Sequence, residues 1–566
     1  MTNLLLTKDA IGARRLLWGV AATIAVVAAI FPAQGAAAVK RHHHRHHQVQ
    51  HPHAQLAHRT LDVQGTAGND AIALRLAAGN PAVIQVDLGD NGSADFSFQR
   101  AKIGRITVEG RGGDDRIRID DTNGTFTDTI PTRIDGGAGN DTITGGAGAE
   151  TLNGGPGNDS IDGKAGNDVS DLGPGDDSFV WDPGDGSDTI EGGGGTDTMV
   201  FDGAAASETV DLSANGDRLI FSRSPANITM NTHSVEHVDF NALGGADSVT
   251  VNNLAGTGVT NVNLDLAGTL GGSTGDGQTD RVTVVGTPGN DAITAAGDTS
   301  GYTVSGLPAQ VTVQHQEPTD QLFVLGVGGD DNISATGLAA GAVSEFLNGG
   351  DGNDTIAGGP GVETLIGGNG SDSIDGNGGN DLASLGAGSD TFVWDPGDGS
   401  DTIEGDNGQD TLVFNGAAAA ETVQLSANGD RLKFFRNPGN ITMDTHGVER
   451  VAFNALGGAD AITVGDLTGT DVSDVDLNLA GTLGGATGDG QSDHVEVDGT
   501  DGNDALTVAG NADDVSVTGL TAAVDIQHAE PADSLDLETF DGINTLASSG
   551  LAAGTLQLLF NGVLVP

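Results

Sequence analysis

Carboxylates are the side chains through which this sequence could do most of its chemistry. The 566-residue chain has 79 Asp and Glu against 23 Lys and Arg, a formal net charge of −56 at pH 7. In two stretches an acidic residue recurs at every ninth position, apart from one two-residue insertion in each stretch, inside turns rich in the chain's 92 glycines. This balance excludes binding to nucleic acid, which requires clustered positive charge, and the absence of cysteine excludes disulfides and thiolate metal sites. So acidic a chain is predicted to be disordered, halophilic or a cation binder.

The nine-residue period covers residues 136–200 and 349–413, with seven repeats in each block. Typical repeats read GGAGNDTIT from Gly136 and GGDGNDTIA from Gly349. Glycine permits sharp turns over the first six positions, and the last three alternate polar and apolar residues as short strands do. The repeats resemble the RTX (haemolysin-type) calcium-binding nonapeptide, GGxGxDxUx. The resemblance implies an all-β fold with little helix outside the N-terminal signal, in which right-handed parallel β-roll blocks, two nonapeptides to a coil, are embedded in an elongated β-solenoid.

The resemblance also implies that the sixth position of each repeat binds Ca²⁺ together with carbonyl oxygens of the turns, since hard oxygen ligands suit this ion. The ligands that it assigns are Asp141, Glu150, Asp159, Asp168, Asp177, Asp188 and Asp197 in the first block, and Asp354, Glu363, Asp372, Asp381, Asp390, Asp401 and Asp410 in the second. We expect several Ca²⁺ per block and folding coupled to binding, because stacked carboxylates about 4.8 Å apart repel each other. Glu150 and Glu363 depart from the pattern, and their longer side chains are expected to distort or weaken their sites. The alternative is that these acidic residues only cap glycine turns.

A longer unit is duplicated around these blocks, since Trp181 and Trp394 lie in identical copies of the phrase FVWDPGDGSDTIEG. We expect both tryptophans to pack between coils, with ligand stacking as the alternative. Single acidic turns also occur outside the blocks, and Val, Thr and Leu alternate with polar residues between them. This pattern favours a continued β-solenoid in the spacers over separate β-sandwiches. The acidic residues of these turns are Asp70, Asp115, Asp247, Asp291, Asp331, Asp460 and Asp504. The predicted division is a signal peptide (1–38), a His-rich disordered linker (39–62), a β-solenoid spacer (63–135), block one (136–203), a second spacer (204–348), block two (349–416), and a third spacer with a truncated third unit (417–566).

The N-terminus predicts export. Lys8, Arg14 and Arg15 precede an apolar run over residues 16–31, and Ala36-Ala37-Ala38 fits cleavage before Val39. An uncleaved anchor is the alternative, and no membrane span is expected after cleavage. The His-rich segment that follows is expected to be a disordered tether that could take up adventitious Zn²⁺ or Ni²⁺. The protein is therefore predicted to be secreted or held at the cell surface.

These features together predict an exported calcium-binding structural or adhesive repeat protein, with cell-surface or matrix polymers as its expected partners. We expect no enzyme and nominate no catalytic residue, because the sequence has no nucleophile elbow, P-loop or zinc-protease motif. Histidines at equivalent places, His233 with His446 and His315 with His528, are expected to be hydrogen-bonded structural residues. The alternative is a repeat-built extracellular carbohydrate-active enzyme, a lyase or an epimerase-like protein, that uses the flank of the solenoid.

Overall fold

The computed structural model describes residues 51–566, which belong to one compact unit. The predicted signal peptide and most of the His-rich segment lie outside the described residues. The described part contains fifty strands and two short 3-10 turns, η1 (Arg100–Lys102) and η2 (Asp121–Asn123), so the all-β prediction is confirmed. In residues 51–566 no helix has the length and apolar character needed to cross a membrane.

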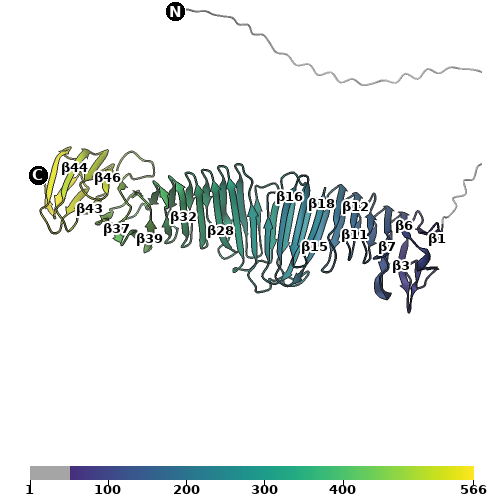
Figure 1. Ribbon diagram of the computed structural model, residues 1–566. Coiled ribbons are helices and arrows are strands. Elements are labelled where there is room, and N and C mark those ends of the chain that lie inside the picture. The colour runs from purple at the N-terminus through teal and green to yellow at the C-terminus, as the bar shows by residue number, and fades with distance from the viewer. Residues whose placement is uncertain (1–50) are drawn as a thin grey trace, which may run out of the picture. The chain divides into compact units, whose positions relative to one another are not determined.

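In the first block each coil contributes one strand to each of two parallel sheets, and the coils follow one another in chain order (Figure 1). Ile143 pairs with Ile161 in one sheet, and Leu152 pairs with Ser170 in the other. Each pair is separated by the length of two nonapeptides, which confirms that two repeats form one coil. The strands of this block are β8 (Thr132–Ala138), β9 (Thr142–Thr144), β10 (Thr151–Asn153), β11 (Ser160–Asp162), β12 (Val169–Pro174), β13 (Ser178–Trp181), β14 (Thr189–Gly194) and β15 (Thr198–Ala205).

The second block repeats this arrangement with the same two-repeat register. Ile356 pairs with Ile374, and Leu365 pairs with Ala383. The apolar eighth position of each repeat faces inward, as its alternation with polar residues predicts. The strands are β28 (Ser344–Asp351), β29 (Thr355–Ala357), β30 (Glu363–Asn369), β31 (Ser373–Asp375), β32 (Leu382–Gly388), β33 (Thr391–Trp394), β34 (Thr402–Glu404), β35 (Asn407–Gly408) and β36 (Thr411–Asn415).

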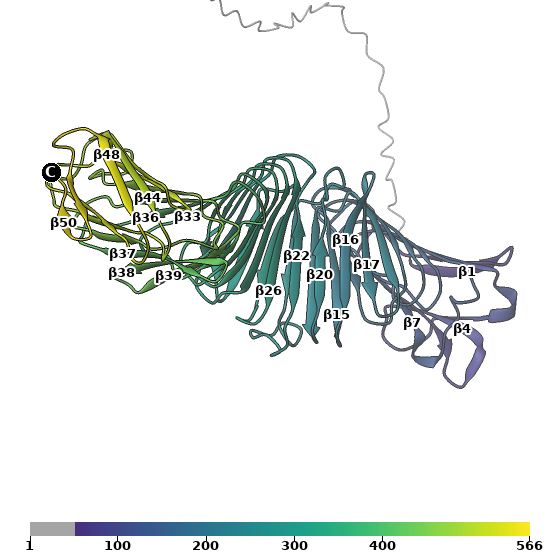
Figure 2. The same ribbon diagram turned by 60° about the vertical axis from the view of Figure 1, so that its left-hand side comes forward.

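The spacers continue the same two sheets, but several of their coils carry an inserted antiparallel strand. In the middle spacer, β17 pairs antiparallel with both β16 and β18, while β16 pairs in parallel with β20 of the next coil. Figure 2 shows β16, β20, β22 and β26 side by side in one sheet. The strands are β16 (Thr209–Asn215), β17 (Arg218–Ser224), β18 (Ile228–His233), β19 (His237–Gly244), β20 (Ser248–Val251), β21 (Asn261–Asp265), β22 (Arg281–Val285), β23 (Ala292–Asp298), β24 (Gly301–Ser305), β25 (Gln310–Gln314), β26 (Gln321–Gly328) and β27 (Asn332–Leu338).

The last spacer copies this pattern, with β38 antiparallel to β37 and β39, and β45 antiparallel to β44 and β46. Hydrogen-bonded sheets therefore run on from the blocks, and the solenoid prediction for the spacers holds against separate sandwiches. The strands are β37 (Thr422–Asn428), β38 (Arg431–Asn437), β39 (Ile441–His446), β40 (Arg450–Asn454), β41 (Ala461–Val464), β42 (Asp474–Asn478), β43 (His494–Asp498), β44 (Ala505–Asn511), β45 (Asp514–Thr518), β46 (Ala523–Gln527), β47 (Ser534–Glu538), β48 (Thr545–Leu551), β49 (Gln557–Phe560) and β50 (Val563–Leu564).

The first spacer begins earlier than the sequence predicts. Residues 53–64 form a hairpin, so the end of the predicted linker (39–62) is mostly strand, not disordered chain. The cause is apolar burial, because Leu61 and Val63 enter the core while β2 pairs in parallel with β6. The strands are β1 (His53–Ala57), β2 (Thr60–Gln64), β3 (Ala71–Ala77), β4 (Asn80–Leu88), β5 (Phe96–Gln99), β6 (Arg105–Gly112) and β7 (Arg116–Asp120).

One continuous apolar core runs inside the coils, and the tryptophans are part of it. Trp181 is fully buried, its ring stacks on Phe201 with centroids 4.0 Å apart, and its indole N–H donates to the Gly186 carbonyl. Trp394 stacks on Phe414 in the same way, at 3.9 Å. Burial leaves neither ring a face for a ligand, so the packing prediction is confirmed over ligand stacking.

Candidate metal centre

Glycine turns bring the carboxylate of each repeat against the turn of a neighbouring coil. A Cβ on Gly154 would lie 2.5 Å from Asp159 Oδ2 and would also collide with the Leu172 carbonyl oxygen. No side chain fits between these two oxygens, so the first position of this repeat must be glycine. The turn therefore brings a carboxylate oxygen of its own repeat and a carbonyl oxygen of the neighbouring coil close to one glycine.

Successive sixth-position residues on one side of the first block are joined by hydrogen bonds into a ladder. The backbone N–H of Asp141 donates to Asp159 Oδ1 at 2.7 Å, and Asp159 N–H donates to Asp177 Oδ1 at 2.7 Å. Asp177 N–H donates to Asp197 Oδ1 at 3.0 Å. The second block has the same ladder at 2.8–2.9 Å, through Asp354, Asp372, Asp390 and Asp410.

The other side of each block carries a shorter ladder that starts at the glutamate. Glu150 N–H donates to Asp168 Oδ1 at 2.6 Å, and Asp168 N–H donates to Asp188 Oδ1 at 2.8 Å. In the second block the shorter ladder runs through Glu363, Asp381 and Asp401, with both bonds at 2.9 Å. The fourteen predicted residues thus form four ladders, two per block. The glutamates keep the ladder bond, and the expectation that they weaken their sites stays a prediction.

One oxygen of each of these fourteen carboxylates is buried and has no hydrogen-bond partner in the protein. The atoms are Oδ2 of Asp141, Asp159, Asp168, Asp177, Asp188, Asp197, Asp354, Asp372, Asp381, Asp390, Asp401 and Asp410, with Glu150 Oε1 and Glu363 Oε2. The residues are 0–3% exposed. Buried polar atoms are almost always paired, and an unpaired buried charge is costly. Rows of buried carboxylate oxygens beside turn carbonyls fit Ca²⁺, which takes six to eight oxygen ligands. These residues would hold the ion, which would supply the missing positive charge.

Burial dominates the electrostatics of the ladders. It raises the pKa of Asp159 to about 7, and repulsion from Asp141 and Asp177 adds to the shift. On the other side, burial raises the pKa of Asp168 to about 9 and that of Asp188 to about 7, again with neighbouring acids contributing. Each ladder therefore carries its full charge at neutral pH only at a cost in free energy. A divalent cation would offset that cost.

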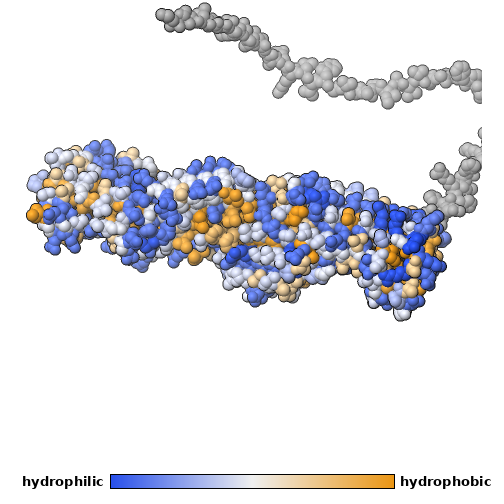
Figure 3. All heavy atoms as spheres, viewed as in Figure 1, coloured by the Kyte–Doolittle hydropathy of each residue, from blue (hydrophilic) through white to orange (hydrophobic). Residues whose placement is uncertain are grey.

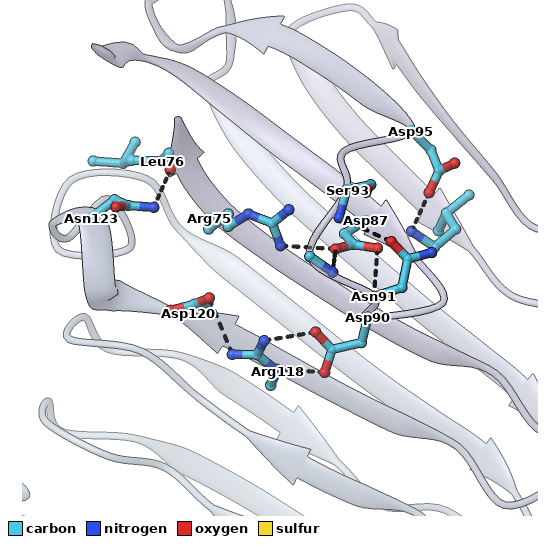
Figure 4. A network of polar contacts seen from close by, with 12 residues as sticks. Arg75, Leu76, Asp87, Asp90, Asn91, Ser93, Asp95, Arg118, Asp120 and Asn123 are labelled. Atoms are coloured by element: carbon cyan, nitrogen blue, oxygen red, sulfur yellow. Dashed lines mark hydrogen bonds and ion pairs between the residues drawn. The ribbon is translucent and has the colours of Figure 1, made fainter. Parts of the chain in front are cut away.

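Some carboxylates outside the ladders are paired with arginine instead. In the first spacer Arg118 makes two hydrogen bonds of 2.7 Å to Asp90, and Arg75 pairs with the buried Asp87 at 3.0 Å (Figure 4). The Arg118 hydrogen bond lowers the pKa of Asp90 below its usual value. The contrast shows that this chain can satisfy an acidic residue with its own side chains, and does not do so in the ladders.

The long ladders extend beyond the residues that the sequence assigns. Asp70 and Asp115 continue the first block's ladder, with Asp115 N–H donating to Asp141 Oδ1 at 2.7 Å. At its other end Asp197 N–H donates to Glu236 Oε2 at 2.9 Å. In the second copy the corresponding residues are Asp291, Asp331 and Glu449. The single acidic turns gave the signal for the aspartates. Glu236 and Glu449 have no glycine turn, and only their equivalent places in the duplicated unit could have revealed them.

The fifth position of the repeats forms an exposed ladder that sequence reasoning missed. Asn158 N–H donates to Asn140 Oδ1 at 2.8 Å, and Asp176 N–H donates to Asn158 Oδ1 at 3.1 Å. These bonds run opposite to those of the buried ladder. The recurring Asn or Asp at this position was the available signal, because short polar side chains bond readily to nearby backbone N–H groups.

The histidines and one further acidic cluster lie apart from the ladders. His233 Nδ1 contacts Glu191 at 3.1 Å, and His315 Nδ1 contacts Asp265 at 2.7 Å, as expected for hydrogen-bonded structural residues. The copies His446 and His528 contact Glu404 and Asn478. Asp474, Asp476 and Asp525 also approach one another within 4.8 Å. Arg450 pairs with the first two, so that cluster already has a counter-charge.

Comparison with known proteins agrees with this geometry. The model of the RTX calcium-binding nonapeptide repeat, which describes four copies, matches residues 132–160, 144–179, 184–204, 340–370, 357–392 and 397–416. No curated protein matches the chain. Among solved structures, the extracellular lipase LipA from Serratia marcescens is similar at 16% identity and a TM-score of 0.14, over 61% of this chain and 43% of the lipase. This chain thus corresponds to less than half of the lipase, and the likeness is too distant to support an inference about function.

Proposed function

The chain carries RTX calcium-binding nonapeptide repeats, and from this we propose that it is an exported structural or adhesive protein whose repeat blocks become ordered on binding Ca²⁺. The observation that carries the proposal is the set of fourteen buried carboxylates, each with one oxygen lacking a partner. Ordering the coils without a cation would bury these charges unpaired, so binding and folding are coupled. Extracellular modules commonly bind Ca²⁺ with dissociation constants of about 10⁻⁴–10⁻³ M, which suits a protein that folds after export.

We propose a non-enzymatic role for the ladders. Their carboxylates are at most 3% exposed, which denies a substrate access to them. General acid–base catalysis needs a titratable group within hydrogen-bond reach of the substrate. Burial behind glycine turns instead suits a metal ion that holds neighbouring coils together.

An apolar area on the outer face of the solenoid supports an adhesive role. Figure 3 shows apolar side chains gathered over β28 and its neighbouring strands. Phe323 and Phe346 face outward in adjacent strands with ring centroids 4.7 Å apart, and the Arg281 guanidinium lies 4.4 Å from the Phe323 ring. Leu382, 48% exposed, lies two strands further along the same outward-facing row. Apolar surface of this kind marks contact sites for partners, for which we propose cell-surface or matrix polymers.

Export and adhesion are tested with the full chain expressed with its own N-terminus in a bacterial host. We expect the protein outside the cytoplasm with Val39 as its first residue, whereas a chain that starts at Val39 stays inside. Cells or beads that carry the exported protein should attach to polymer-coated surfaces in millimolar Ca²⁺ and detach in chelator, and Mg²⁺ should not substitute. Cytoplasmic retention of the full chain would refute export. Attachment that persists unchanged in chelator would refute calcium-dependent adhesion.

A further inference from the structure

Buried carboxylates also form a ladder in the middle spacer, outside the residues that the repeat model matches. Glu208 N–H donates to Asp247 Oδ1 at 2.7 Å, and Asp247 N–H donates to Asp280 Oδ1 at 2.8 Å. Asp280 N–H then donates to Asp320 Oδ1 at 2.9 Å. All four residues are 2–4% exposed. The hydrogen bonds follow the same pattern as in the repeat blocks. Successive rungs, meaning the acidic residues joined by these bonds, are however separated by many more residues than two nonapeptides contain.

The last spacer contains the same ladder. Glu421, Asp460, Asp493 and Asp533 occupy the equivalent places in the duplicated unit, are joined by bonds of 2.8–2.9 Å, and are 2–3% exposed. Residues directly next to the rungs differ between the two units, as where Ser248 corresponds to Ala461 and Arg281 to His494. The ladder has therefore been kept in both copies while residues close to it changed.

Only the first rung of the spacer ladder has a counter-charge. Arg223 binds Glu208 Oε1 through Nε at 2.7 Å, and its guanidinium lies over the Trp181 ring. Arg436 binds Glu421 in the same way. Each arginine therefore neutralises the glutamate of its own ladder and leaves the aspartates of the following rungs without a positive partner.

The next two rungs face only acids. The charges that act on Asp247 come from Asp280, Glu208 and Asp276, and those on Asp280 come from Asp320, Asp276 and Glu317. Asp276 is held at this corner because its Oδ2 accepts the Gly245 N–H at 2.6 Å. The corner therefore concentrates negative charge in a place with little access to water.

An unpaired oxygen points to a ligand at this corner. Asp247 Oδ2 is buried without a hydrogen-bond partner, and so is its counterpart, Asp460 Oδ2. We propose that each spacer binds a divalent cation, Ca²⁺ by the hardness of its oxygen donors, at the corner formed by Asp247, Asp276 and Asp280 in the first unit. In the second unit the corner is formed by Asp460, Asp489 and Asp493. These ions would fasten the long coils between the blocks, as the repeat ions fasten the short ones.

The number of bound ions tests the proposal. The fourfold variant Asp247→Asn, Asp280→Asn, Asp460→Asn and Asp493→Asn keeps the side-chain oxygens that accept the ladder bonds and removes four charges. In equilibrium dialysis of the full chain we expect this variant to bind one Ca²⁺ fewer per unit than the parent. The repeat blocks should still bind Ca²⁺, which separates failure of this inference from failure of the proposed function. An unchanged number of ions would overturn the inference.

A second readout does not depend on the fold of the aspartate variants. Tyr302 is the chain's only tyrosine, and in the second unit Val515 takes its place. Burial raises the pKa of Tyr302 above its usual range, and the charges of Asp320, Glu345 and Asp280 add to this shift, so the phenol lies within electrostatic reach of the spacer ladder. With Tb³⁺ in place of Ca²⁺, ultraviolet excitation of the parent should give terbium emission that falls in Tyr302→Phe. Emission equal in the two proteins would contradict a site at this corner.

Discussion

Acidification should partly replace Ca²⁺ in ordering the metal-free blocks. The perturbation is a pH change from 8 to 5 in the presence of chelator. Burial raises the pKa of Asp188 from 3.8 to about 7 in the folded coil. The pKa of Asp188 is thus higher in the folded coil than in the unfolded chain, so its protonated carboxyl stabilises the folded coil. This stabilisation is complete below the pKa of the unfolded chain and is lost as the pH rises through about 7.

The magnitude follows from the difference between these two pKa values. A pKa difference of one corresponds to about 1.4 kcal/mol, so ionised Asp188 costs about 4 kcal/mol in the folded coil, less whatever counterions screen. Burial also raises the pKa values of Asp159 and Asp401 to about 7, so several rungs titrate over the same window. The metal-free protein should therefore unfold at higher urea at pH 5 than at pH 8.

The assay is urea unfolding of the full chain followed by far-ultraviolet circular dichroism, with chelator and with millimolar Ca²⁺. In millimolar Ca²⁺ the protein should instead be more stable at pH 8 than at pH 5, because protons compete with the ion for the same carboxylate oxygens. Asp188→Asn should reduce the pH dependence in chelator, whereas the exposed control Asp541→Asn should leave it unchanged. A metal-free chain that is less stable at pH 5 than at pH 8 would refute the reasoning about buried ladders.

Three further substitutions, two of them with a matched control variant, test packing and ligation. Gly155 has a φ of 104°, and a Cβ there would collide with the Gly137 carbonyl. Gly155→Ala should therefore lower the free energy of unfolding in urea by roughly 1–3 kcal/mol. The control Gly194→Ala, which has open space around its Cβ, should lower it much less. Equal costs would contradict the close approach of coils. Trp394→Ala should lose about 3–5 kcal/mol in thermal or urea unfolding because it empties a fully buried site, and a loss below about 1 kcal/mol would argue against its packing role. Asp177→Asn should weaken Ca²⁺ binding in a calorimetric titration whereas the exposed Asp176→Asn should not, and equal effects would show that general surface charge governs affinity.

The repeat period predicted the geometry of the blocks well. A nonapeptide with glycine in its first positions and an apolar eighth position buries that residue if turns and strands alternate, and the resemblance to RTX repeats supplied the two-repeat register seen between Ile143 and Ile161. The same period places Asp159 above Asp141. The period does not show how each side chain divides its oxygens, one to a backbone N–H and the other to a ligand.

The spacers were harder to predict because their coils differ in length. Asn215-Gly216, between two strands, is a hairpin signal that the sequence offers for the inserted strand β17. The end of the long ladder at Glu236 has no local signal, since the residue lies in a strand-like phrase without a glycine turn. Contacts between residues far apart in the sequence, such as Asp197 with Glu236, depend on the length of an entire coil.

The glutamates share a position that no single repeat reveals. Glu150, Glu208, Glu363 and Glu421 each stand on the first rung of a ladder, and aspartates fill the rungs that follow. A first rung need not accept a ladder bond from a preceding acidic turn, so the longer side chain can reach another group, as Glu150 Oε2 reaches the Gly146 N–H at 2.9 Å. What looks in the sequence like a defect in the repeat therefore coincides, in these four ladders, with the first rung, whereas the two long ladders start with Asp70 and Asp291.

The coupling of Ca²⁺ binding to coil formation is tested most directly by amide hydrogen exchange of the full chain, read peptide by peptide with and without the ion. Peptides from residues 136–203 and 349–416 should exchange slowly in millimolar Ca²⁺ and rapidly in chelator, because the backbone N–H groups of the ladders are protected only when the coils are stacked. Equal protection in the two conditions would contradict the account, since the coils would then form without the cation.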